Sequence, residues 1–203
     1  MISGLQEDGT IENAEYAGLR RELVVRKAAM RDIAPILGLI NGYAAQGVML
    51  PRTELEVSED IRDFSVIVTA GRLVGCGALH FYTPSIAEIR SLAVAEDAKT
   101  HGIGRRLIEA LVREAVDYSL EAVFAFTYVA DFFRKMSFQE VERGELPLKA
   151  WKDCVRCPKF QCCDEIAVLR VLRPEYCRSI QQYQRNDDSQ LVQLPALQTL
   201  KSR

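Results

Sequence analysis

The 203-residue chain lacks several features that define large classes of protein. No apolar run approaches the ~20 residues of a membrane span, so no membrane partner is expected. The net charge is −2, which gives no electrostatic reason to expect nucleic acid as a partner. The first residues, MISGLQEDGTIENAEY, are acidic and polar, so no secretory signal is predicted and we expect a cytoplasmic protein. In that reducing compartment the six cysteines do not indicate a disulfide framework.

What the chain does contain is enough apolar sequence for one core. Hydrophobic residues make up 48% of it, which suits one globular domain of roughly 150 residues with tails. Residues 1–22 lack sustained periodicity and are predicted to be a flexible leader. Residues 23–172 carry the regular apolar patterns of a domain. Residues 173–203 are polar and glutamine-rich, so we assign them to a C-terminal tail.

Apolar periodicities in the first half predict strands and helices that alternate around a central sheet, an α/β (α+β) arrangement. A short strand at 23–26 precedes a helix that Asp32 is placed to cap and that Gly47 ends. Pro51 and the polar residues after it predict a loop and a second short helix. Two apolar strands flank Ala70-Gly71-Arg72, a predicted hairpin.

The second half continues the alternation. The run 122–129 is almost entirely apolar, as expected of a strand buried on both faces. Asp131 is then predicted to cap a short helix, and further strands are predicted at 138–141 and 165–172. These elements would complete the sheet.

The stretch 88–118 joins a strand, a loop and a long amphipathic helix. Gly102 and Gly104 fall where the loop becomes the helix, and without a Cβ they let a ligand approach the backbone. The first N–H groups of a helix have no intrahelical partner, so with the helix dipole they form a binding site for a phosphate. A capping turn without a ligand is the alternative. A dinucleotide-binding turn fits less well, because its three glycines belong to one βαβ unit.

The spacing Lys99-x-x-Gly102-x-Gly104, after a strand that ends in LAV, resembles the pyrophosphate-binding segment of the GNAT acetyltransferase superfamily. That family usually has Arg or Gln where this chain has Lys99. The resemblance implies the GNAT fold, a mixed central β-sheet flanked by helices with a V-shaped splay between two central parallel strands. It also implies acetyl-CoA as co-substrate. The residues it implies for acetyl-CoA binding are Leu92, Ala93, Val94, Lys99, Thr100, His101, Gly102, Ile103, Gly104, Arg105 and Phe133.

The segment DFFRKMSF resembles the family's short helix that ends in Gly-Phe, but departs from it twice. Ser137 replaces the glycine, which is expected to shorten or reshape the helix cap. Phe133 stands where many relatives have a tyrosine that protonates the departing thiolate. The acid is left unassigned, because core packing is the expected role of nearby Tyr128. A thiol with a pKa near 8.5 is a tolerable leaving group without one.

A narrower resemblance concerns the acceptor. The segments VRKA, AAQGVMLPRTELEV, LVGCGAL, AEIRSLAV and FTYVADFFRKMSF, in that order, resemble the acetyltransferase domain of N-acetylglutamate synthases. The ending LPLKAWKDCVRCPKFQCCDEIAV is similar to the short, single-domain bacterial form. The resemblance implies acetyl transfer from acetyl-CoA to the α-amine of L-glutamate, the committed step toward arginine. A homodimer is left open. The alternatives are another acceptor amine (a different amino acid, a polyamine or a protein N-terminus) and a non-catalytic acetyl-CoA sensor.

Glu88 is the candidate catalytic residue, because the acceptor arrives as an ammonium and must lose a proton before it attacks the thioester. The resemblance places it at the base position of related acetyltransferases. The alternative is that Glu88 only pairs with Arg90, its same-face neighbour. The two carboxylates of glutamate call for cationic partners. The candidates are Arg52, Arg90, Lys149 and Arg156, with Arg52 and Arg156 favoured over Lys149, and each could equally be a solvated charge.

The cysteines of the C-terminal segment suggest a metal site only weakly. Cys154-x-x-Cys157 followed by Cys162-Cys163 offers four thiolates, as tetrahedral zinc requires. The second pair is adjacent, however, and adjacent cysteines rarely chelate one metal together. A site of Cys154, Cys157 and Cys163 is left open, but thiols that pack or respond to oxidation are the favoured interpretation.

Overall fold

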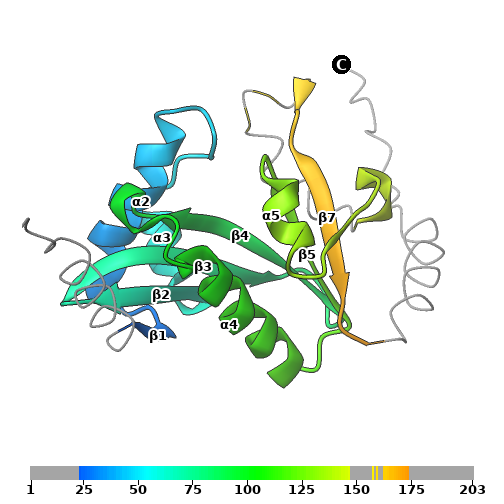
Figure 1. Ribbon diagram of the computed structural model, residues 1–203, viewed down its shortest axis with the longest axis horizontal. Helices are drawn as coiled ribbons and strands as arrows, with labels where there is room; N and C mark the ends of the chain where they lie inside the picture. The colour runs from blue at the N-terminus through cyan, green and yellow to red at the C-terminus, as the bar shows by residue number, and fades with distance from the viewer. Residues whose placement is uncertain (1–22, 147–156, 158, 160–161, 174–203) are drawn as a thin grey trace, which may run out of the picture.

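The computed structural model describes residues 23–146, 157, 159 and 162–173 (Figure 1). The predicted leader and the tail beyond residue 173 lie outside the described residues. The helices are α2 (Ile33–Ala44), α3 (Glu54–Glu59), α4 (Ile103–Asp117) and α5 (Ala130–Arg134), with short 3-10 turns η1 (Met30–Asp32), η2 (Ile61–Asp63), η3 (Glu96–Ala98) and η4 (Arg143–Glu145). The strands are β1 (Val24–Lys27), β2 (Phe64–Thr69), β3 (Arg72–Phe81), β4 (Ile86–Val94), β5 (Ala122–Thr127), β6 (Gln139–Glu140) and β7 (Ile166–Val171). Among these helices none is long and apolar enough to cross a membrane.

The strands form one seven-stranded mixed sheet in the order β1-β2-β3-β4-β5-β7-β6. Strands β4 and β5 are parallel, and the other neighbours are antiparallel. Ala70 and Gly71 join β2 to β3 with φ angles of 46° and 76°, as in the two-residue turns that suit twisted hairpins. The predicted hairpin is therefore confirmed.

Helices cover both faces of the sheet (Figure 1). On one face, Leu111 of α4 packs in the same cluster as Leu79 of β3. The next residue back along β3, Ala78, packs in a different cluster with Ile36 of α2 and Val57 of α3. Because successive strand residues point to opposite faces, α4 and the α2–α3 pair lie on opposite sides. The apolar stripe predicted for the long helix is the stripe that α4 buries.

The parallel pair at the centre of the sheet separates after its first residues. Strands β4 and β5 pair at Ile86 with Ala122, at Ala87 with Val123 and at Glu88 with Phe124. Beyond these pairs β4 runs on to its end at 94 and β5 to its end at 127 without pairing with each other. Figure 1 shows the halves β1–β4 and β5–β7 diverging. The predicted V-shaped splay is confirmed.

A bulge bends β4 along the splay. The register between β3 and β4 shifts so that Gly77 lies opposite two residues of β4. Ser91, in that part of β4, has a φ of 54°. A Cβ on Gly77 would come within 3.1 Å of the Leu92 side chain, so glycine makes room for the bend. Bulges disrupt a ladder and re-aim side chains, and this one lies where β4 has left β5.

Of the two predicted helix caps, Asp32 lies at the predicted N-cap position but makes no capping hydrogen bond, and the prediction for Asp131 is wrong. Asp32 holds the N-cap position of α2, but its carboxylate accepts from the Ala29 N–H at 2.8 Å and from Arg26 at 2.7 Å. It therefore stabilises the preceding 3-10 turn and ties it to β1. Asp131 lies inside the first turn of α5 and pairs with Arg134 at 2.5 Å. There a carboxylate interacts with the helix dipole and not with an orphan N–H as a cap does.

The serine at the end of α5 keeps the geometry that a glycine would provide. Ser137 has a φ of 64°, the left-handed conformation usual at this position of a helix end. Its N–H donates to the Arg134 carbonyl at 3.1 Å, and the Phe138 N–H donates to the Phe133 carbonyl at 3.3 Å. Serine in place of glycine thus strains the backbone locally, while the helix end keeps its shape.

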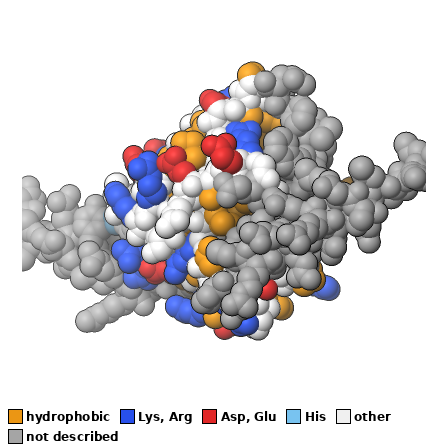
Figure 2. All heavy atoms as spheres, turned by 90° about the vertical axis from the view of Figure 1, so that its right-hand side faces the viewer, with side chains coloured by type: hydrophobic (Ala, Val, Ile, Leu, Met, Phe, Trp, Pro, Cys, Tyr) orange, Lys and Arg blue, Asp and Glu red, His pale blue; other side chains and the backbone are white. Residues whose placement is uncertain are grey.

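In the view of Figure 2, the described residues form no large patch of charged side chains of a single sign. Blue basic and red acidic side chains are interspersed there, with orange apolar side chains between them. This mixture agrees with the net charge of −2.

Candidate active site

A cavity of about 1270 Å³ opens where β4 and β5 part. Its described walls come from the end of α2 and the loop after it, from β4, from the start of α4, from the end of β5 with α5, and from the segment before β7. The splay thus produces a space that reaches from the helix N-terminus of α4 to the buried carboxylate of Glu88.

The N-terminus of α4 forms one end of this cavity. Gly102 is the N-cap in a left-handed conformation, with φ 73° and ψ 12°, and Thr100 also has a φ of 73°. The first N–H groups of the helix, from Ile103 onward, have no intrahelical acceptor. Consecutive amides in such a turn, with the helix dipole behind them, favour an anion.

Gly104 serves packing as well as ligand approach. A Cβ there would come within 3.0 Å of the tip of the Phe132 ring, whereas a Cβ on Gly102 would meet nothing within 4 Å. The second glycine of the motif therefore lets the α5 ring lie against α4. The first is required by its backbone angle.

Lys99 lies beside the end of β4. Its Nζ is 2.7 Å from Glu96 and 5.0 Å above the Tyr43 ring, and hydrogen bonds to Glu96 and Tyr43 raise the pKa of this ammonium. The Tyr43 hydroxyl donates to the Val94 carbonyl at 2.6 Å. Tyr43 therefore fixes the last residue of β4 and places a cation at the mouth of the cavity.

Glu88 is buried, with 8% of its surface exposed, and it lines the cavity at the last paired residue of the splay. The Tyr82 hydroxyl donates to its Oε2 at 2.9 Å. Arg90, the predicted alternative partner, places a guanidinium nitrogen 2.8 Å from Asp60 and also lines the cavity. The carboxylate thus accepts a hydrogen bond from Tyr82 at the point where the two strands part.

Arg52 is positioned by its own backbone. Its N–H donates to the Asn41 side-chain oxygen at 2.9 Å, and its carbonyl accepts from the Asn41 amide at 3.0 Å. The next residue, Thr53, caps α3 with a reciprocal bond to Glu56. The loop is therefore clamped between α2 and α3 with Arg52 lining the cavity.

The segment before β7 supplies cavity residues that the sequence did not indicate. Arg143 lies across it, with its guanidinium donating to the Cys163 carbonyl at 3.3 Å and to the Glu165 carbonyl, and lying 5.8 Å from the Phe126 ring. Burial raises the pKa of the Glu165 carboxyl. In sequence, Arg143 resembles any solvated charge in a polar segment, so no pattern marked it.

Lys159 and Tyr128 form a second contact at this wall. The Lys159 Nζ lies 3.1 Å from the Tyr128 hydroxyl and 4.9 Å above the ring. Burial raises the pKa of Tyr128, so its phenol stays protonated at neutral pH. Tyr128 is 37% exposed, so the expectation that it packs in the core is wrong. It lines the cavity instead, because β5 ends one residue before it.

The cavity gathers most of the predicted site residues. The residues that line it are Arg52, Glu88, Arg90, Leu92, Val94, Lys99, Thr100, Gly102, Ile103, Gly104, Arg105 and Phe133. Ala93 is instead buried against α2. His101 is exposed, with Nδ1 3.0 Å from the Lys99 carbonyl. Cys157 and Cys163 also line the cavity. The predicted Lys149, Cys154 and Arg156 lie outside the described residues.

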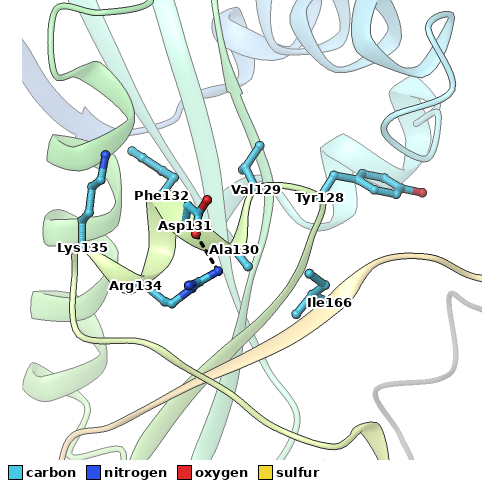
Figure 3. A pocket seen from close by; sticks show the side chains of 8 residues that line it. All are labelled: Tyr128, Val129, Ala130, Asp131, Phe132, Arg134, Lys135 and Ile166. Atoms are coloured by element: carbon cyan, nitrogen blue, oxygen red, sulfur yellow. Dashed lines mark ion pairs between the residues drawn. The ribbon is translucent and has the colours of Figure 1, made fainter.

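A smaller pocket of about 440 Å³ lies along α5 and the start of β7 (Figure 3). Figure 3 shows Asp131 and Arg134 facing each other in it and Ile166 on the β7 side. Tyr128, Val129 and Phe132 line both this pocket and the large cavity. The two spaces therefore share the first turn of α5 and the residues before it as a common wall.

A splayed parallel pair with a glycine-capped helix N-terminus at its mouth defines the class of acetyl-CoA-dependent N-acetyltransferases. The chain belongs to the acetyltransferase (GNAT) family, whose sequence model matches residues 42–138. An uncharacterized N-acetyltransferase of Chlorobaculum tepidum is 42% identical over 148 residues, which cover 73% of this chain and 96% of that protein. Acetyl-CoA is accordingly the co-substrate.

Two further comparisons concern acceptors. The amino-acid acetyltransferase of Mycobacterium tuberculosis is 34% identical over 136 residues, covering 66% of this chain and 78% of that protein. The N-acetylglutamate synthase from Neisseria gonorrhoeae, solved with coenzyme A and N-acetyl-glutamate, superposes with a TM-score of 0.69 at 28% identity. That match covers 74% of this chain but only 35% of the synthase chain. The chain thus corresponds to about a third of the longer enzyme.

Proposed function

We propose that the protein transfers acetyl from acetyl-CoA to the α-amine of L-glutamate, in the cytoplasm, as the committed step toward arginine. The observation that carries the proposal is the charge of the cavity wall. Among the described residues that line it, the basic side chains are Arg52, Arg90, Lys99, Arg105, Arg143 and Lys159, and the acidic ones are only Glu88 and Glu165. A cavity of this sign suits an acceptor with two carboxylates better than a polyamine.

In this proposal acetyl-CoA binds along the part of β4 that does not pair with β5. Its pyrophosphate lies at the first amides of α4, where Lys99 and Arg105 add positive charge. Its pantetheine arm runs along the part of β4 beyond Glu88 that has no partner in β5. Strand N–H groups there can donate to the thioester carbonyl, which stabilises the charge that develops on its oxygen.

Glu88 is the proposed base. It takes a proton from the ammonium of glutamate, directly or through one water. The freed nitrogen lone pair attacks the thioester carbon, an N–C bond forms, and the C–S bond breaks as the intermediate loses its second N–H proton. The CoA thiolate leaves and is protonated, so one proton is released to solvent per turnover. A thiol with a pKa near 8.5 leaves without a dedicated acid.

Cations on two sides of the cavity are the proposed carboxylate partners. Arg52 lies on the loop between α2 and α3, where Asn41 holds its backbone, and it lines the cavity. Arg143 and Lys159 line the opposite wall. Bidentate pairing with a carboxylate suits the guanidinium of Arg52, which is not required for the Asn41 clamp because that clamp uses only the backbone.

The test is a CoA-release assay over a panel of amino acids, polyamines and peptide N-termini. We expect L-glutamate to give the highest kcat/KM. In Arg52→Gln the KM for glutamate should rise about tenfold or more, with the KM for acetyl-CoA unchanged. Arg113→Gln, an exposed change on α4 outside the cavity, is the matched control and should behave as wild type. A neutral or cationic amine that outcompetes glutamate would overturn the acceptor assignment.

A further inference from the structure

A chain of side-chain contacts leads from η2 across β3 to Glu88. Asp63 Oδ2 lies 2.7 Å from His80 Nδ1, and His80 is the cross-strand partner of Glu88 in the β3–β4 register. The His80 ring meets the Tyr82 ring edge-on, with centroids 5.1 Å apart and planes at 84°. The Tyr82 hydroxyl then donates to Glu88. These side chains form a continuous path from η2 to the carboxylate.

The Tyr82 ring is confined on two sides. His80 contacts it on one side, and Phe124, which is fully buried, contacts it with centroids 5.7 Å apart and planes at 39°. Aromatic contacts at these separations are favourable and directional. These contacts restrict the ring, and its hydroxyl points at the Glu88 carboxylate.

The hydrogen bond matters because Glu88 is buried next to apolar rings. Burial disfavours the charged form of a carboxylate, whereas a hydrogen bond donated to the carboxylate favours it. A base must be charged before it can take a proton from the substrate ammonium. Glu88 pairs with Phe124 in the sheet register and has 8% of its surface exposed, so the hydrogen bond from Tyr82 favours its ionised form.

We propose that Tyr82 is a positioning residue for Glu88, and that the Asp63–His80 pair holds Tyr82 in place. Tyr82 keeps the carboxylate charged and aimed into the cavity. His80 and Tyr82 do not line that cavity, so they act through Glu88 and not on the substrate. The inference rests on the proposed role of Glu88 as the base, and it holds for whichever amine is acetylated.

Other charges also surround the base. On this face of the sheet and along the cavity they are Arg90, Asp60, Arg52, Arg143, Lys159 and Glu165. A carboxylate oxygen of Asp60, one of Asp63 and a ring nitrogen of His80 lie within 4.8 Å of one another. All of these groups are unchanged when only the Tyr82 hydroxyl is removed. Their influence therefore cancels in a comparison of Tyr82→Phe with the wild type.

The experiment is the pH profile of kcat/KM for Tyr82→Phe, measured by CoA release with the best acceptor. Loss of the hydroxyl should move the acidic limb up by about one pH unit, because a hydrogen bond to a charged group accounts for about a tenfold change. Below the midpoint of the acidic limb the rate should fall by up to about tenfold, and above the limb it should return to within about threefold of wild type. The Kd for acetyl-CoA should not change.

Matched variants separate positioning from structural damage. Tyr118→Phe removes a hydroxyl from an exposed ring that makes a similar edge contact, 5.1 Å from Phe81, and should leave the profile unchanged. Asp63→Ala should move the acidic limb in the same direction as Tyr82→Phe but less. Asp63→Asn, which keeps an oxygen for His80, should restore the wild-type profile.

A loss of rate in Tyr82→Phe that is equal at every pH, or no loss at all, would overturn the positioning role. Glu88→Gln is assayed in parallel. If it turns over as fast as wild type, the base assignment itself is wrong, and the positioning role is overturned with it. If glutamate is a poor acceptor but another amine supports turnover, the acceptor proposal fails while the Tyr82 comparison is made with that amine.

Discussion

Replacing Gly102 by alanine tests whether the start of α4 is the pyrophosphate-binding site. Gly102 has a φ of 73°, and a Cβ there would meet nothing within 4 Å, so the only cost is conformational. The left-handed region costs a non-glycine residue about 1–2 kcal/mol. If the turn of the free variant relaxes out of this conformation and bound pyrophosphate restores it, that strain falls on the complex alone, and the Kd for acetyl-CoA should rise about 5- to 30-fold. Isothermal titration calorimetry measures this directly.

Gly71→Ala is the matched control for this prediction. Gly71 has a φ of 76°, and a Cβ there also meets nothing within 4 Å, but it lies at the tip of the β2–β3 hairpin outside the cavity. Gly71→Ala should lose about 1 kcal/mol of stability, since the reduced freedom of the unfolded alanine chain offsets part of the strain. Free Gly102→Ala should lose less, because its turn can relax when no ligand is bound. Only Gly102→Ala should lose affinity. Wild-type affinity in Gly102→Ala, with the same drop in Tm as Gly71→Ala, would refute the reasoning.

Three further changes test other parts of the structure. Ser137→Gly should raise the free energy of unfolding in urea by about 0.5–1 kcal/mol, because glycine adopts the observed φ of 64° without strain. Burial raises the pKa of the Cys76 thiol to about 12, so at pH 8 a thiol reagent should label it about a thousandfold more slowly in the native protein than in denaturant, as read by peptide mass spectrometry. Hydrogen bonding to Arg26 holds the pKa of Asp32 below its ordinary value. Asp32→Asn should therefore cost about 1–2 kcal/mol at pH 7, and the difference from wild type should shrink as the pH falls below the ordinary carboxyl pKa toward the lower folded value.

Each of these has a contrary outcome. A lower unfolding midpoint in Ser137→Gly would mean that the serine hydroxyl makes a stabilising contact. Fast labelling of Cys76 in the folded protein would show that β3 opens locally. A difference between Asp32→Asn and wild type that stays constant from pH 7 to pH 3 would mean that the ion pair does not act through the Asp32 charge.

Most of the fold could be predicted because its elements repeat at helix or strand spacing. The long helix was predicted from apolar residues such as Leu107 and Leu111, which α4 buries. The hairpin at 70–71 was marked by its glycine, and the splay by the family resemblance. The glycine motif also located the start of α4, although packing against Phe132 explains Gly104 as well as ligand approach does.

The caps and the far wall of the cavity could not be predicted, because they depend on long-range contacts. Asp32 has the residue type of a cap, but Arg26 on β1 draws its carboxylate to another bond. Arg143 and Lys159 belong to no periodic pattern, and they reach the cavity only because β7 inserts between β5 and β6. Tyr82 lies six residues from Glu88, and only the β3–β4 pairing brings its hydroxyl to the carboxylate.

The central claim is that a carboxylate at the parting of two strands deprotonates an amine beside acetyl-CoA. The most direct measurement is glutamate-dependent CoA release by Glu88→Gln, with acetyl-CoA affinity measured on the same sample. The account predicts a rate about 100-fold or more below wild type, with the Kd for acetyl-CoA within about twofold of wild type because the pyrophosphate-binding site at α4 is untouched. A rate within about threefold of wild type, with the same affinity, would contradict it.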